Sequence, residues 1–161
     1  MNQALLTRLS EESTDFVVIG GVCCVYYGVS LATFGLDICC QFGEPNLRKI
    51  EKAVRDLHPF HRLAANKLPL ELTADLCSRL HNLYLRTDLG RLDCLSEVAG
   101  IGGYEKVLER SEKAKFSYGE FRFLTIAALI EAKEAVGREC DLSAIKQLRA
   151  IKEKREHGKS V

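Results

Sequence analysis

Two aspartates, Asp37 and Asp93, combine a reactive side chain with an apolar setting that is typical of strands. Each lies between two apolar neighbours in a short hydrophobic run. Carboxylates on neighbouring strands that face the same side of a sheet can share one Mg²⁺ or Mn²⁺ ion, because such cations accept oxygen ligands. Asp37 and Asp93 are therefore candidate metal ligands and candidate catalytic residues.

A glycine pair, Gly20-Gly21, separates the apolar run 16–19 from a second apolar segment, 22–28. Glycines between a strand and a helix let the backbone approach a phosphate, with the helix N–H groups aimed at the anion. The same pair is also typical of a tight turn that binds nothing. The sequence leaves both interpretations open.

The elements that would position these residues follow from the spacing of apolar side chains. Short β-branched and apolar runs predict strands, and apolar residues three and four apart predict amphipathic helices. We expect strands at 16–19, 36–42, near 68–72, 81–86 and 91–95, with a small hairpin inside 116–124. We expect helices at 5–9, 22–28, 45–57, 104–112, 125–136 and 141–156.

Composition and length predict one cytoplasmic domain that spans residues 1–161. Hydrophobic residues make up 47% of the chain, and 23 Lys+Arg against 22 Asp+Glu give a net charge of +1. Such a balance gives no global attraction to nucleic acid or to a membrane. The N-terminus lacks the basic flank and apolar run of a signal peptide, and the apolar stretch 16–24 is too short to span a bilayer. We expect no membrane partner.

The seven cysteines include two adjacent pairs, 23–24 and 39–40, in apolar runs, and none has C-x-x-C spacing. This pattern favours reduced, buried thiols over a zinc site or a disulfide framework. Sequences typical of serine hydrolases and of P-loops are also absent from the chain.

Four segments, in order, resemble motifs of the nucleotidyltransferase-fold superfamily. They are Phe16–Gly21, Thr33–Asp37, Thr87–Asp93 and Lys133–Asp141. The first two are similar to the family's Gly-Gly and Thr-x-Asp-[Leu/Ile]-Asp core, and the third to its Thr-x-x-Gly-x-[Leu/Val]-Asp strand. The fourth is similar to the Lys-x(3)-[Gly/Ala]-Arg-x-x-Asp helix pair. The relatives include minimal nucleotidyltransferases and toxin-type proteins of bacterial abortive-infection and toxin–antitoxin systems.

The resemblance implies an α/β (α+β) fold, with helices packed on a mixed β-sheet and a C-terminal helical pair. It implies transfer of a nucleotidyl group from a nucleoside triphosphate to a hydroxyl acceptor, with Mg²⁺ or Mn²⁺. The acceptor would be RNA, a protein or a small molecule, and a protein partner is also expected. The implied catalytic and metal-binding residues are Asp37 and Asp93, and the implied nucleotide-binding residues are Gly20, Gly21, Thr33, Lys133 and Arg138.

The departure from the family pattern lies at Gly35, which stands where the family has its first catalytic carboxylate. Residues i and i+2 of a strand face the same way, so the missing oxygen ligands belong to the site of Asp37. The sequence therefore leaves two functions open. One is a nucleotidyltransferase with impaired activity, and the other is a catalytically degenerate module that binds a nucleotide, RNA or a protein partner.

Structural alternatives also remain for the charged residues. Asp37 or Asp93 would serve equally as a buried ion-pair partner of Lys133 or Arg138. The two cations would otherwise lie on a solvated helix face. Asp141 fits either a cap of the last helix or a substrate contact.

Overall fold

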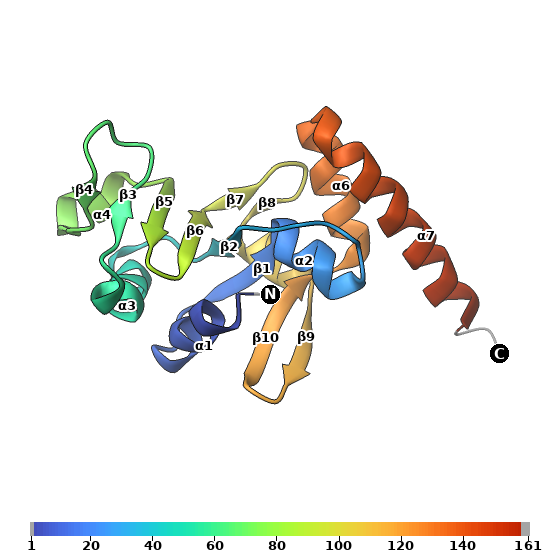
Figure 1. Cartoon of the computed structure of the whole chain (residues 1–161), viewed down its shortest axis with the longest axis horizontal. Coiled ribbons are helices and arrows are strands. Elements are labelled where there is room, and N and C mark those ends of the chain that lie inside the picture. Colours follow the sequence, from blue (N-terminus) through green and yellow to red (C-terminus); the bar gives the residue numbers. More distant parts are fainter. Residues whose placement is uncertain (1, 159–161) are drawn as a thin grey trace.

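An eight-stranded mixed sheet carries both candidate aspartates near its middle in the computed structural model, which describes residues 2–158 (Figure 1). The strand order is β4-β3-β5-β6-β2-β1-β10-β9. The strands are β1 Phe16–Ile19, β2 Gly35–Cys40, β3 Phe60–His61, β4 Leu68–Pro69, β5 Asn82–Thr87, β6 Gly90–Leu95, β9 Ser111–Phe116 and β10 Gly119–Leu124. A separate pair, β7 Glu97–Val98 and β8 Gly102–Gly103, follows β6.

The register of the central strands brings the two aspartates together. β2 and β6 run parallel, and Asp37 is paired with Asp93 across them. β2 is antiparallel to β1, which places Ile19 opposite Asp37. β1 is parallel to β10, and Val18 is paired with Phe123, although the two residues lie 105 positions apart in the sequence. The expectation that the aspartates lie on neighbouring strands is confirmed.

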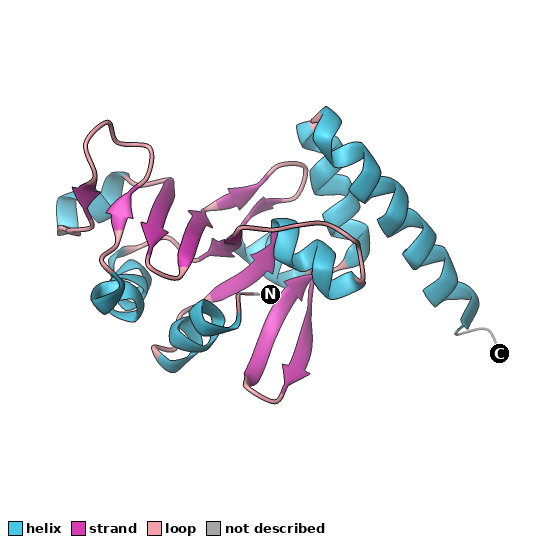
Figure 2. Ribbon diagram, viewed as in Figure 1, coloured by secondary structure: helices cyan, strands magenta, loops and turns pink. Residues whose placement is uncertain are grey.

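The helices pack on this sheet and form a pair at the C-terminus (Figure 2). They are α1 Gln3–Glu11, α2 Gly20–Tyr27, α3 Glu44–Val54, α4 Ala74–Arg79, α5 Tyr104–Glu109, α6 Ile126–Val136 and α7 Leu142–Gly158, with single 3₁₀ turns at Arg55–Leu57 and Glu139–Asp141. α2 contacts β1 and β2, and α6 contacts both α2 and α7. The predicted α/β class, with a C-terminal helical pair, is therefore correct.

Local signals account for several element boundaries. The side chain of Thr125 accepts a hydrogen bond from the Ala128 N–H and caps the start of α6. Gly137 ends α6 in the left-handed conformation, with φ of 67°, which glycine adopts without a steric penalty. A proline in the first turn of α3 needs no hydrogen-bond partner for its nitrogen, as expected for the start of that helix.

Two sequence expectations were wrong in detail. Residues 111–112 were expected in a helix but belong to β9, the edge strand of a hairpin with β10 that is longer than predicted. Alternating charged residues on an edge strand give no apolar periodicity, so the strand was hard to detect. The apolar spacing of Leu142, Ile145 and Leu148 in the expected last helix also predicts that all three are buried, yet Leu142, at the very start of α7, is 62% exposed.

The core is continuous and includes most of the cysteines. Six cysteines are buried free thiols, and only Cys140 is exposed. The expected burial of the two adjacent pairs, 23–24 and 39–40, is therefore confirmed. Within residues 2–158 no helix is both long enough and apolar enough to cross a membrane.

Candidate functional site

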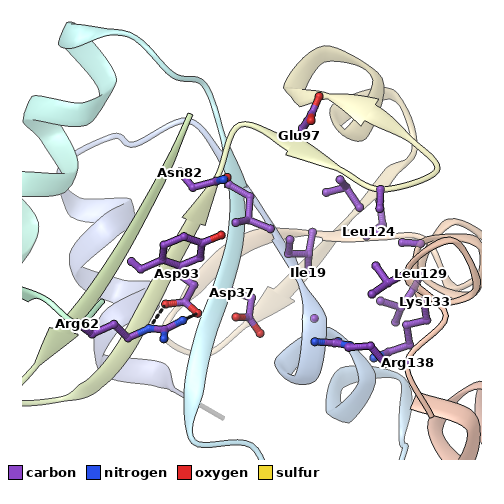
Figure 3. Close-up of a pocket in the computed structure, with 17 residues that line it drawn as sticks. Ile19, Asp37, Arg62, Asn82, Asp93, Glu97, Leu124, Leu129, Lys133 and Arg138 are labelled. Atoms are coloured by element: carbon purple, nitrogen blue, oxygen red, sulfur yellow. Dashed lines mark hydrogen bonds and ion pairs between the residues drawn. The ribbon is translucent and has the colours of Figure 1, made fainter. Parts of the chain in front are cut away.

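A pocket of about 540 Å³ opens beside Asp37 and Asp93 (Figure 3). Its lining combines charged and apolar side chains. The charged side chains that line it include Asp37, Arg62, Asp93, Lys133 and Arg138. The apolar lining comes from Ile19, Leu95, Val98, Leu124, Leu129, Ala132 and Val136. A volume in this range suits a small organic ligand with both apolar and charged parts.

Asp37 belongs to β2, and its carboxylate lies at the N-terminal end of α2. The Gly21 backbone N–H donates a hydrogen bond to its carboxylate. A Cβ atom at Gly20 would lie 2.3 Å from Oδ2 of Asp37, and Gly20 also has a φ of +63°. The glycine pair thus lets the aspartate's own carboxylate take the position that a bound anion takes at a helix N-terminus.

The environment of Asp37 disfavours its ionised form. Burial raises the pKa of its carboxyl group above the ordinary value of 3.8, and the nearby charge of Asp93 raises it further. The Gly21 N–H, Arg91 and Lys133 act in the opposite direction but do not cancel the rise in pKa. Asp37 is therefore a partly desolvated carboxylate that repels its neighbour on β6.

Asp93 is held by an arginine that the sequence did not single out. Nε of Arg62 donates to Oδ1 of Asp93 at 2.9 Å, and Nη2 donates to Oδ2 at 2.5 Å. The Arg62 guanidinium also lies 5.1 Å from the ring centre of Tyr84. Asp93 raises the pKa of Arg62 by accepting these hydrogen bonds, which favours the charged form of the guanidinium. Figure 3 shows this pair on one side of Asp37.

The space beside Gly35 is filled by Arg91. The two residues are register partners on β2 and β6. A Cβ atom at Gly35 would lie 2.8 Å from Cβ of Arg91 and 3.3 Å from its Nε. The family resemblance predicts a third carboxylate at this place. The space is instead occupied by the cationic side chain of Arg91.

Lys133 and Arg138 share a third carboxylate, that of Asp141. Nζ of Lys133 lies 2.5 Å from Oδ1 of Asp141, and Nε of Arg138 lies 2.7 Å from Oδ2. Lys133 and Asp141 are almost buried, with side chains 10% and 8% exposed. Burial alone opposes ionisation of Asp141, but the hydrogen bonds from the two cations lower its pKa overall. Asp141 therefore forms an ion pair with two cations, a role that was not among the two expected for it, a helix cap or a substrate contact.

The donor set does not fit a divalent metal as it stands. Magnesium requires several oxygen ligands in near-octahedral geometry. Both oxygens of Asp93 are already hydrogen-bonded to Arg62. Within the described part of the chain, no three His, Cys, Asp or Glu residues form a group that could hold a metal ion.

The predicted site residues are only partly brought together. Gly20, Asp37, Asp93, Lys133 and Arg138 line the pocket. Gly21 and Thr33 contact each other behind it: a Cβ atom at Gly21 would lie 2.9 Å from Oγ1 of Thr33, which donates to the Gly35 carbonyl. These last two residues hold the α2–β2 loop against the strand.

Sequence reasoning missed Arg62 because it lies in the segment 60–80, where the apolar pattern is poor. The strand that precedes Arg62, β3, is only two residues long. The sequence shows only that Arg62 is a basic residue ahead of the predicted strand 81–86. That position does not identify Asp93 as its partner.

No protein-family model matches the chain, and no curated protein is significantly similar to it in sequence. The function is therefore argued from the geometry of the site.

Proposed function

We propose that the protein is a nucleotide-binding module of the nucleotidyltransferase type in which nucleotidyl transfer is suppressed. The observation that carries this proposal is the bidentate ion pair between Arg62 and Asp93. It commits one of the two candidate catalytic carboxylates to an internal cation. Arg91 beside Gly35 supports the same conclusion, because it occupies the space expected for the missing acid.

The mixed charged and apolar lining of the pocket supports a nucleoside triphosphate as the ligand. Ile19 at the end of β1, Leu124 at the end of β10 and Leu129 on α6 offer an apolar surface that suits a base. Arg138 uses only Nε for Asp141, so its terminal amino groups make no hydrogen bond to another described residue. Its side chain is 62% exposed and suits a phosphate group.

Calorimetric titration with each of the four common nucleoside triphosphates tests the binding step. We expect saturable binding of at least one of them. Arg138→Ala should weaken this binding by about tenfold, the effect of losing one charge-assisted contact. Arg149→Ala is the matched control, because Arg149 is also 62% exposed and also pairs with a carboxylate, Glu134, but lies outside the pocket. Failure of all four nucleotides to bind would exclude the proposal.

Assays of pyrophosphate release and of label transfer test the second step. We expect the bound nucleotide to be recovered intact, with RNA, protein or small hydroxyl compounds as acceptors. The competing function is an active nucleotidyltransferase, and the in-register pair of Asp37 and Asp93 favours it. Robust transfer that is lost in Asp37→Ala would establish that enzyme and reject the binding module.

A further inference from the structure

We propose that Arg62 is a built-in counter-ion that keeps divalent metal away from the carboxylate pair. This inference rests on the proposed function, since it gives the physical cause of suppressed transfer. The guanidinium takes the oxygen atoms of Asp93 that a metal shared with Asp37 would need. The positive charge of Arg62 thus compensates the negative charge of Asp93 from within the chain.

Three contacts hold Arg62 in this position. Its backbone N–H donates to the Tyr84 carbonyl at 3.0 Å, which fixes the start of the side chain. Tyr84 is the register partner of Asp93 on the neighbouring strand, β5. The guanidinium lies over the ring of that same tyrosine while it binds Asp93. The arginine is therefore placed by the sheet itself and has little freedom to leave.

The competition with a metal ion follows from burial and charge. The side chains of Arg62 and Asp93 are 24% and 13% exposed, so their attraction is only partly screened by water. A divalent ion that binds Asp93 must break two charge-assisted hydrogen bonds and approach a fixed positive charge. Arg91, on the same face two residues earlier, adds a second positive charge. Both effects lower the affinity for metal.

Titration with Mn²⁺ alone, followed by calorimetry and by the electron paramagnetic resonance of free Mn²⁺, tests this competition. We expect weak binding by the unmodified protein and about tenfold tighter binding by Arg62→Gln, because loss of one charge-assisted contact is worth a factor of this size. The double variant Arg62→Gln/Asp93→Asn should lose the gain. Arg8→Gln is the matched control, because Arg8 also binds an aspartate, Asp56, through two nitrogen atoms, far from the pocket.

Two further variants keep the test decisive if Arg62→Gln is poorly folded by circular dichroism. Arg62→Lys retains the charge without the two-pronged geometry and should give a smaller gain in Mn²⁺ affinity. Asp93→Asn alone should give no gain in Mn²⁺ affinity, since the gain requires both the loss of the Arg62 cation and the carboxylate of Asp93. A gain of affinity in Asp93→Asn, or no gain in folded Arg62→Gln or Arg62→Lys, would overturn the inference. The Mn²⁺ titrations contain no nucleotide, so they test this inference separately from the proposed function. If nucleotide binds but the Arg62 variants show no gain in Mn²⁺ affinity, only this inference is rejected. If the Arg62 variants gain Mn²⁺ affinity but no nucleotide binds, only the proposed function is rejected.

Discussion

At the scale of single residues, Asp37, Asp93 and Asp141 each already have a partner inside the chain. Asp37 accepts from the N-terminus of α2, Asp93 binds Arg62, and Asp141 binds Lys133 and Arg138. The sequence predicted that Asp37 and Asp93 would face the same side of the sheet, because alternation along a strand sets the direction of a side chain. It did not predict Arg62 as the partner of Asp93, since Arg62 lies 31 residues away in a segment with little apolar pattern.

The raised pKa of Asp37 predicts a pH-dependent effect of Asp37→Asn on stability. The folded state holds the proton of Asp37 more tightly than the unfolded state does, so the free energy of unfolding falls as the pH rises from about 4 through the raised pKa. Asparagine carries no such charge and still accepts from the Gly21 N–H. We expect Asp37→Asn to have a higher melting temperature than the unmodified protein at pH 7, with a difference that shrinks toward pH 4.

Thermal unfolding between pH 4 and pH 8 measures this difference. Asp75→Asn is a suitable control, because Asp75 is 75% exposed and pairs with Arg79 on the surface of α4. A lower melting temperature for Asp37→Asn across the whole range would contradict the argued cost of burying that charge.

At the scale of elements, the sequence predicted what depends on local pattern and missed what depends on partners. The strand 16–19 and the end of the helix at residue 136 were predicted at their observed positions. The pairing of β10 beside β1 was not, because no residue of either strand encodes which neighbour it will have. The two-residue strand β3 was missed for a similar reason: its place depends on β5, and the chain around it lacks apolar periodicity.

The ion pair between Lys133 on α6 and Asp141 in the following turn predicts a large stability effect. Asp141→Ala would leave a buried ammonium group without its partner, which costs about 3–5 kcal/mol. The matched control is Glu131→Ala, on the same helix, whose carboxylate is 50% exposed and pairs with Arg110. Loss of that surface pair should cost less than about 1 kcal/mol.

Chemical denaturation of both variants gives the two free energies of unfolding. Replacing both partners, in Lys133→Met/Asp141→Leu, should recover part of the loss, because no buried charge then remains unpaired. Equal losses in Asp141→Ala and Glu131→Ala would mean that Lys133 finds water or another partner when Asp141 is removed.

At the scale of the whole molecule, one continuous core connects the sheet with the helices that carry the site. The cysteines of β2, α2 and β6 lie in this core as small apolar residues. The sequence indicated this role through their apolar neighbours, which Cys140, between Glu139 and Asp141, does not have. Cys140 is exposed because it lies in the short turn between α6 and α7, outside the packed layers.

The contrast between Cys140 and the six buried cysteines predicts the thiol reactivity of the native protein. A short pulse of iodoacetamide should add one label, at Cys140, whereas the chain unfolded in guanidinium should accept seven. A buried thiol reacts only when the core opens, and burial also raises the pKa of Cys23 well above its usual range, so less of the reactive thiolate is present. Mass spectrometry counts the labels, and Cys140→Ser should remain unlabelled in the native pulse. Two or more labels on the native protein within that pulse would show that the core opens far more readily than its packing implies.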